Sequence, residues 1–230
     1  MKTTMLGRFR VALAILGSAA LWLAATPLAM AIVLENPGSI IVQQVNDHPC
    51  LFGGNSCNNP AGFGYTLLSN TPPGDTYNAD SPTYTVGQIR DILKLTDPLN
   101  YNSFFVGIDV NTTKAASETL QQFAMYVGGV LVQQFSAAPP GDPLTSVNNG
   151  TGFSDALLKT FELTGYADGA SVMFHLIENG AVDGSEEYFL VNAANPQPVP
   201  EPSTLLLMAV AAIGLSLLGH RHRRGRHREA

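Results

Sequence analysis

The residues most able to hold a ligand are the acidic side chains between positions 178 and 187. That segment reads ENGAVDGSEE and carries Glu178, Asp183, Glu186 and Glu187. Carboxylate oxygens are the ligands that calcium prefers, and the two glycines allow the sharp turns of a loop around an ion. The spacing does not match an EF-hand loop. We therefore interpret the segment as a solvated hairpin turn at its Asp-Gly pair, with a calcium site as the alternative.

The two cysteines, Cys50 and Cys57, enclose six residues. We predict a disulfide between them, because the export signal described below leads to an oxidising compartment. Closing a loop of eight residues would stabilise the fold by about 2.5 kcal/mol in the chain-entropy treatment. The alternative is a metal site that also uses His48. Two Cys and one His form an incomplete zinc set, and the spacing between the cysteines is wider than usual for zinc.

The residues that could support catalysis are few. Residues 32–195 contain only two histidines, His48 and His175, and no nucleophile elbow, phosphate-binding loop or zinc-protease motif. We expect His48 in a loop and His175 on a sheet surface, because it alternates with Val172 and Phe174. We predict that the protein is not an enzyme and has no required cofactor. A Ser–His–Asp set or a carboxylate pair assembled by the fold would instead make it an unusual hydrolase.

Exposed aromatic rings would indicate carbohydrate binding, because flat rings stack on sugars. Tyr65, Tyr77, Tyr84 and Tyr101 lie in or near turn-rich regions. Tyrosines at strand ends are more often packed than used for sugar binding. A carbohydrate-binding module, with calcium as an optional ligand, is therefore the second functional hypothesis.

Short strands must position these side chains. The segments rich in β-branched and aromatic residues are 39–45, 64–68, 84–88, 104–110, 123–135, 157–166, 171–177 and 186–191. The clusters of Asn, Pro, Gly and Asp between them predict an all-β fold, a single β-sandwich or jelly roll. Gly128-Gly129 predicts a hairpin turn inside 123–135. Val86–Leu95 and Ala115–Gln122 have helical character, and we expect one short helix at most.

Composition excludes several protein classes. Of 230 residues, 45% are hydrophobic and 13% are charged, so a disordered, highly charged chain is excluded. The net charge of −6 is uneven: residues 32–199 hold sixteen acids against Arg90, Lys94, Lys114 and Lys159. Such an acidic domain repels nucleic acid and anionic membranes. Nucleic acid is therefore not an expected partner.

Residues 1–31 are predicted to be a signal peptide. A basic start precedes an apolar run, Val11–Ala25, and a Thr-Pro breaker follows it. Ala29 and Ala31 fit the A-x-A pattern of signal peptidase cleavage, which places the cut before Ile32. The alternative is an uncleaved anchor helix. Either reading predicts an exported domain at residues 32–195.

Residues 196–230 contain three elements in order. Prolines alternate in PQPVPEP, which favours a stiff, unpaired polyproline II stretch. An apolar segment follows and predicts a transmembrane helix over 204–219. A basic tail then predicts a cytoplasmic end. Its arginines are Arg221, Arg223, Arg224, Arg226 and Arg228.

This tripartite tail resembles the PEP-CTERM sorting signal of Gram-negative bacteria. The motif residues are Val199, Pro200, Glu201 and Pro202, followed by the apolar helix and the basic tail. The resemblance implies recognition by an exosortase, a membrane protease-transpeptidase that cuts near Pro-Glu-Pro. It gives these residues a recognition role, not a catalytic one. It also links such proteins with exopolysaccharide and biofilm formation.

The first functional hypothesis is thus a structural or interaction protein of the cell surface or extracellular matrix, associated with exopolysaccharide. It would begin as a precursor anchored in the inner membrane by residues 204–219. Signal peptidase and an exosortase would process it.

Overall fold

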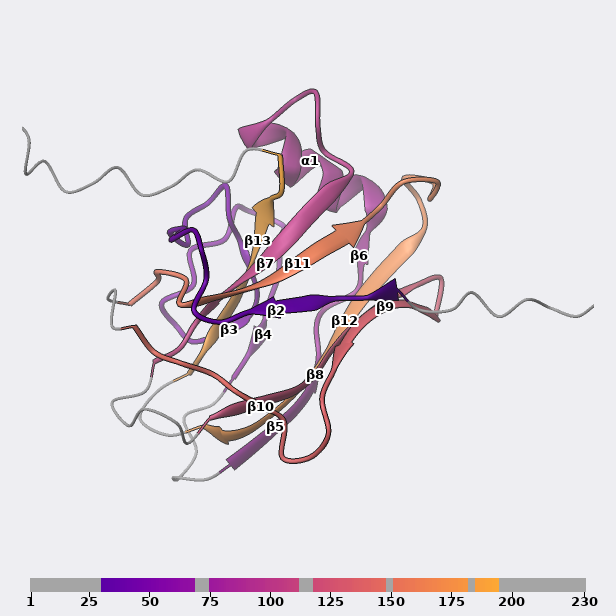
Figure 1. The fold of residues 1–230 in the computed structure, drawn as a ribbon. Helices are drawn as coiled ribbons and strands as arrows, with labels where there is room; N and C mark the ends of the chain where they lie inside the picture. The colour runs from indigo at the N-terminus through magenta and orange to yellow at the C-terminus, as the bar shows by residue number, and fades with distance from the viewer. Residues whose placement is uncertain (1–29, 69–74, 112–117, 148–150, 182–184, 195–230) are drawn as a thin grey trace, which may run out of the picture.

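The computed structural model describes residues 30–68, 75–111, 118–147, 151–181 and 185–194 (Figure 1). Ala29, Asp183, the sorting motif, the apolar segment 204–219 and the basic tail all lie outside the described residues. The predictions made for those parts are not addressed by the structure.

Two sheets, named here A and B, account for the strands. Sheet A contains β1 (Met30–Ala31), β5 (Asp75–Asp80), β6 (Tyr84–Thr85), β8 (Thr119–Val127), β9 (Val130–Ser136), β10 (Asp142–Pro143) and β12 (Ser171–Ala181). Sheet B contains β2 (Val33–Glu35), β3 (Cys50–Gly53), β4 (Thr66–Leu67), β7 (Ser103–Asp109), β11 (Ala156–Glu162) and β13 (Glu187–Asn192). Most pairs are antiparallel, whereas β1 with β9 and β3 with β4 are parallel. The all-β prediction is confirmed.

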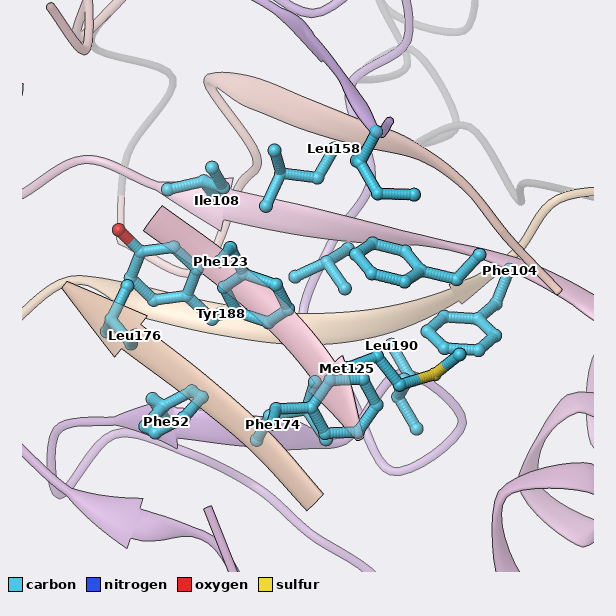
Figure 2. Close-up of a cluster of buried hydrophobic side chains, with 14 of the residues drawn as sticks. Phe52, Phe104, Ile108, Phe123, Met125, Leu158, Phe174, Leu176, Tyr188 and Leu190 are labelled. Carbon is cyan, nitrogen blue, oxygen red and sulfur yellow. The ribbon is translucent and has the colours of Figure 1, made fainter. Parts of the chain in front are cut away.

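The two sheets pack face to face around an aromatic core (Figure 2). Phe123 and Phe174 come from sheet A, and Phe104, Phe161 and Tyr188 come from sheet B. The ring centroid of Phe123 lies 5.8 Å from that of Phe161 and 5.7 Å from that of Tyr188. These contacts cross from one sheet to the other, and aromatic pairs in such geometry add to the energy of area burial.

The outer face of sheet B is covered by a second, smaller cluster. Its buried members are Val42, Cys50, Phe189 and Val191. Phe189 lies over Gly107 of the neighbouring strand, where a Cβ atom would come within 2.6 Å of the ring. The centre of sheet B is therefore covered on its outer face as well, and strand β13 has no exposed residue, whereas Val33 of β2 and Leu67 of β4 are exposed.

The helix α1 (Val86–Thr96) begins at Val86, the residue where the sequence predicted a helix. The strand predicted over residues 84–88 is therefore limited to β6, Tyr84–Thr85. Thr85 is its N-cap: the Thr85 hydroxyl accepts from the Gln88 amide, and the Gln88 side chain accepts from the Thr85 amide. Ile89 and Leu93 are buried against the core. The second helical candidate, Ala115–Gln122, is wrong from Thr119 onward, because these residues pair in β8.

The hairpin prediction at Gly128-Gly129 is confirmed. Both glycines have positive φ, 59° and 78°, which favours residues without a Cβ. The strand predicted at Ser39–Val45 is not formed. Only isolated bridges occur there: the Gln44 amide donates to the Gly152 carbonyl and the Ser154 amide donates to the Val42 carbonyl, while the Val42 amide donates to the Ser154 hydroxyl instead of a carbonyl.

Within the described residues, the structure contains no helix that combines the length and apolar character needed to cross a membrane.

Candidate functional site

The first part of the site comes from strand β12. Its inward positions are Val172, Phe174, Leu176 and Glu178, so the acidic residue continues the row of core side chains. Glu178 is fully buried. Its place at the end of β12 that pairs with β5 puts it at the end of the domain opposite α1 (Figure 1).

The second part comes from the beginning of strand β13, where two consecutive glutamates point to opposite faces. Glu186 continues the inward row of Tyr188 and Leu190, whereas Glu187 continues the outward row of Phe189. Both glutamates are fully buried. The acidic pair is therefore divided between the core of the domain and the outer face of sheet B.

Glu118, which the sequence analysis did not consider, completes the site. It is fully buried immediately before β8. One carboxylate oxygen each from Glu118, Glu178 and Glu186 lies within 4.8 Å of the others. Glu178 lies in β12 of sheet A, Glu118 immediately precedes β8 of the same sheet, and Glu186 immediately precedes β13 of sheet B, so the three carboxyl groups meet between the sheets. We call this set the Glu triad.

The Tyr188 hydroxyl is one hydrogen-bond donor to the Glu triad. It donates to Glu178 Oε2 at 2.8 Å. Figure 2 shows the Tyr188 ring beside Phe123 with its hydroxyl at the margin of the apolar cluster. Among the described residues, Glu178 Oε1 and both side-chain oxygens of Glu186 are buried without a hydrogen-bond partner. The triad thus sits where the aromatic core ends.

Burial dominates the electrostatics of the triad. Loss of hydration raises the pKa of Glu178, and the nearby Glu118 carboxyl raises it further. Loss of hydration also raises the pKa of Glu186, with repulsion from Glu178 and Glu118 as the next causes. Three ionised carboxylates cannot share an apolar interior without compensation. The triad must therefore hold protons or a cation.

Basic side chains of the described residues do not supply that compensation. Each forms an ion pair elsewhere: Arg90–Asp168, Lys94–Asp91 and Lys159–Glu35. The fourth basic residue of the domain, Lys114, lies outside the described residues.

The interpretation of residues 178–187 as a solvated hairpin turn is wrong. The flanking strands β12 and β13 belong to different sheets, so the segment crosses between sheets. Glu178, Glu186 and Glu187 are all fully buried. Of the proposed calcium ligands that the structure describes, Glu178 and Glu186 come together and Glu187 faces away from them, whereas Asp183 lies outside the described residues.

The predicted disulfide Cys50–Cys57 is present. It lies near the Glu187 side chain, whose Oε1 accepts from the Ser56 hydroxyl. Because both sulfur atoms are bonded to each other, they are not metal ligands. His48 is buried, with Nδ1 3.0 Å from the Gln43 carbonyl oxygen. Burial lowers the pKa of His48.

A second acidic group occupies the outer face of sheet B. Asp109 lies opposite Glu187 across the β7–β13 pair, and its Oδ2 accepts from the Gly152 amide at 2.5 Å. Asp155 accepts from the Val110 and Val147 amides. Burial raises the pKa of Asp109 to about 7, and Glu187 and Asp155 add repulsion.

The arrangements that would indicate a hydrolase are a Ser–His–Asp set and an accessible pair of carboxylates. His175 lies on the sheet surface as expected, with Nδ1 2.7 Å from Asp80 Oδ1. In the described part of the chain, His175 forms no hydrogen bond with a serine hydroxyl. The converging carboxylates of the Glu triad are fully buried, so a substrate has no direct access to them.

The tyrosines do not form an exposed aromatic surface. Tyr77 and Tyr84 are buried, and Tyr84 stacks on Phe63 with ring centroids 4.5 Å apart. Tyr65 and Tyr101 are partly buried against the two apolar clusters. The observation that would have favoured sugar stacking is absent at these four positions.

Comparison with known proteins assigns the C-terminal part of the chain. The PEP-CTERM protein-sorting motif matches residues 198–224. The chain therefore carries this motif, as its sequence predicted, and the motif implies an exported protein that an exosortase processes. No curated protein and no solved structure matches the chain.

Proposed function

We propose that the chain is the precursor of a structural or interaction protein of the cell surface or extracellular matrix. The match of residues 198–224 to the PEP-CTERM motif is the observation that carries this proposal. Residues 32–195 form the delivered domain. The segment 204–219 holds the precursor in the inner membrane until the exosortase acts near Pro200, Glu201 and Pro202.

The described domain supports such a destination in two ways. Its two cysteines form a disulfide, which persists in oxidising compartments outside the cytoplasm. The central strand β13 is buried along its whole length, and the two sheets share one apolar core. Association with exopolysaccharide or a biofilm is the finer part of the proposal, and it rests on the resemblance of the tail.

We propose no catalytic role. The only histidine–aspartate pair among the described residues, His175 with Asp80, lies on a sheet surface without a serine partner, and the Glu triad is closed to substrate. The carbohydrate-binding alternative gains nothing from Tyr77 and Tyr84, because both are buried. A buried metal ion could not contact a sugar either.

Intact mass spectrometry of the protein from the source organism tests the sorting proposal. We expect a form in the medium or matrix that begins at Ile32 and ends near residues 200–203. The variant with alanine at Pro200, Glu201 and Pro202 should stay in the membrane with its basic tail. A matched control with alanine at Pro196 alters the same proline-rich stretch outside the matched residues 198–224.

The control variant should be processed like the wild type. A wild-type protein found only in membranes, with its basic tail intact, would overturn exosortase processing. Co-fractionation with purified exopolysaccharide, compared with the medium fraction, then tests the matrix association.

A further inference from the structure

We propose that the Glu triad binds one calcium ion, which joins sheet A to sheet B at the end of the domain opposite α1. The ligands are Glu118, Glu178 and Glu186. This assignment does not depend on how the chain is sorted.

The geometry suits a single ion. Calcium binds oxygen at about 2.3–2.6 Å, so two ligand oxygens on opposite sides of one ion lie up to about 5 Å apart. The three carboxylate oxygens of the triad lie within 4.8 Å of one another. Three bidentate carboxylates offer six oxygens, which meets the lower end of the calcium coordination number.

Unpartnered oxygens point to a ligand independently of the clustering. Glu186 is fully buried, and neither of its side-chain oxygens forms a hydrogen bond of normal geometry among the described residues, although its own backbone amide and the Glu118 carboxyl lie close enough to influence its pKa. Glu178 Oε1 has none either, although Oε2 accepts from Tyr188. Buried polar atoms are nearly always paired, so a group of unpaired oxygens that lie close together indicates a cation-binding site.

Calcium fits better than the other common cations. The ligands are all hard oxygens, which disfavours zinc and copper. Magnesium retains several waters and requires a near-ideal octahedron, whereas the triad is closed to solvent. A divalent ion leaves one negative charge on the three carboxylates, and the Tyr188 hydroxyl partly compensates it.

The test measures metal binding by the purified protein in its exported form. After gel filtration in calcium buffer, elemental analysis should find one calcium per chain, and a calcium chelator should remove it. Terbium, a trivalent calcium substitute, should show luminescence on excitation of the nearby Tyr188 ring. Calcium at a hundredfold excess over its Kd should raise the Tm by roughly 5–11 °C, whereas magnesium should have a much smaller effect.

Matched variants distinguish the ion site from general damage. Glu186→Gln keeps the shape of the side chain and should lose bound calcium, terbium luminescence and the calcium-dependent rise in Tm. Glu187→Gln changes the neighbouring glutamate, which faces away from the triad, and should keep all three.

Two outcomes would overturn the proposal. Absence of bound calcium and of any calcium-dependent rise in Tm in the wild type would mean that the triad shares protons without a metal. Equal calcium binding by the wild type and Glu186→Gln would place the ion elsewhere.

Discussion

Acidification should stabilise the domain, and Asp109 should account for a large part of the effect. Its side chain is 2% exposed, and burial raises its pKa from 3.8 to about 7. Between these two pH values the folded protein holds a proton that the unfolded chain has lost, so stability rises as the pH falls through 7. One pKa unit corresponds to about 1.36 kcal/mol, so acidification to pH 5 contributes about 3 kcal/mol.

The variant Asp109→Asn removes this titration and keeps an oxygen that can accept the hydrogen bond from the Gly152 amide. It should therefore lack about 3 kcal/mol of the gain that the wild type shows between pH 8 and pH 5. His48 acts in the opposite direction. Burial lowers its pKa from 6.5, so protonation of the unfolded chain below that pH reduces stability. This effect is common to both proteins and cancels in their difference.

Urea unfolding at several pH values, in the presence of chelator, measures the effect. Far-UV circular dichroism is the suitable probe, because the single tryptophan, Trp22, lies in the predicted signal peptide. Asp142→Asn makes the same charge change at an exposed position and should follow the wild type. Parallel profiles of the wild type and Asp109→Asn, within about 0.5 kcal/mol, would refute the reasoning.

Three substitutions test the packing. Replacing Cys50 and Cys57 together by alanine should lower the free energy of unfolding by about 2.5 kcal/mol, measured by urea titration. Gly107→Ala should cost about 1–3 kcal/mol, because its Cβ would meet an aromatic ring at 2.6 Å, whereas Gly169→Ala enters open space and should not. Phe123→Ala removes a fully buried ring and should cost about 3–5 kcal/mol, seen as a lower Tm.

The sequence predicted much of the fold because several strands and the helix begin or end at residues with a strong local preference for a turn or a cap. The β8–β9 hairpin forms where two glycines accept positive φ, and α1 begins at the Thr85 cap. At Ser39–Val45 the same reasoning failed. β-branched residues favour extended backbone, but the pairing with residues 152–154 is interrupted where the Val42 amide donates to the Ser154 hydroxyl rather than to a carbonyl, so no continuous ladder forms.

The acidic segment was misread because hairpins and crossovers share turn residues. An Asp-Gly pair between two strands predicts that those strands pair with each other. Here β12 pairs with β5, β6 and β8, and β13 pairs with β3 and β7. Alternation contained the missing information: Glu178 has the parity of Phe174 and Leu176, so strict alternation already placed it in the core.

Glu118 could not be found in this way, because the alternation of β8 changes phase. Phe123, Met125 and Val127 face the core at odd positions, whereas Leu120 faces it at an even one. A shift in the β8–β12 register, between Ile177 and Glu178, inserts the extra residue. Because of such a bulge, residues before it and residues after it face the core at positions of opposite parity. Reading back from Phe123 by twos would therefore place Glu118 outside, whereas the bulge turns it inward.

The sorting motif and the Glu triad differ in how far the sequence alone can reveal them. The sorting motif is a run of consecutive residues, so it can be recognised in the sequence itself. The Glu triad instead draws on residues 118, 178 and 186, which only the pairing of β8 with β12 and the packing of the two sheets bring together. An ion that holds this junction would make the domain most stable where calcium is available, and chelation should loosen the contact between sheets before it unfolds either one.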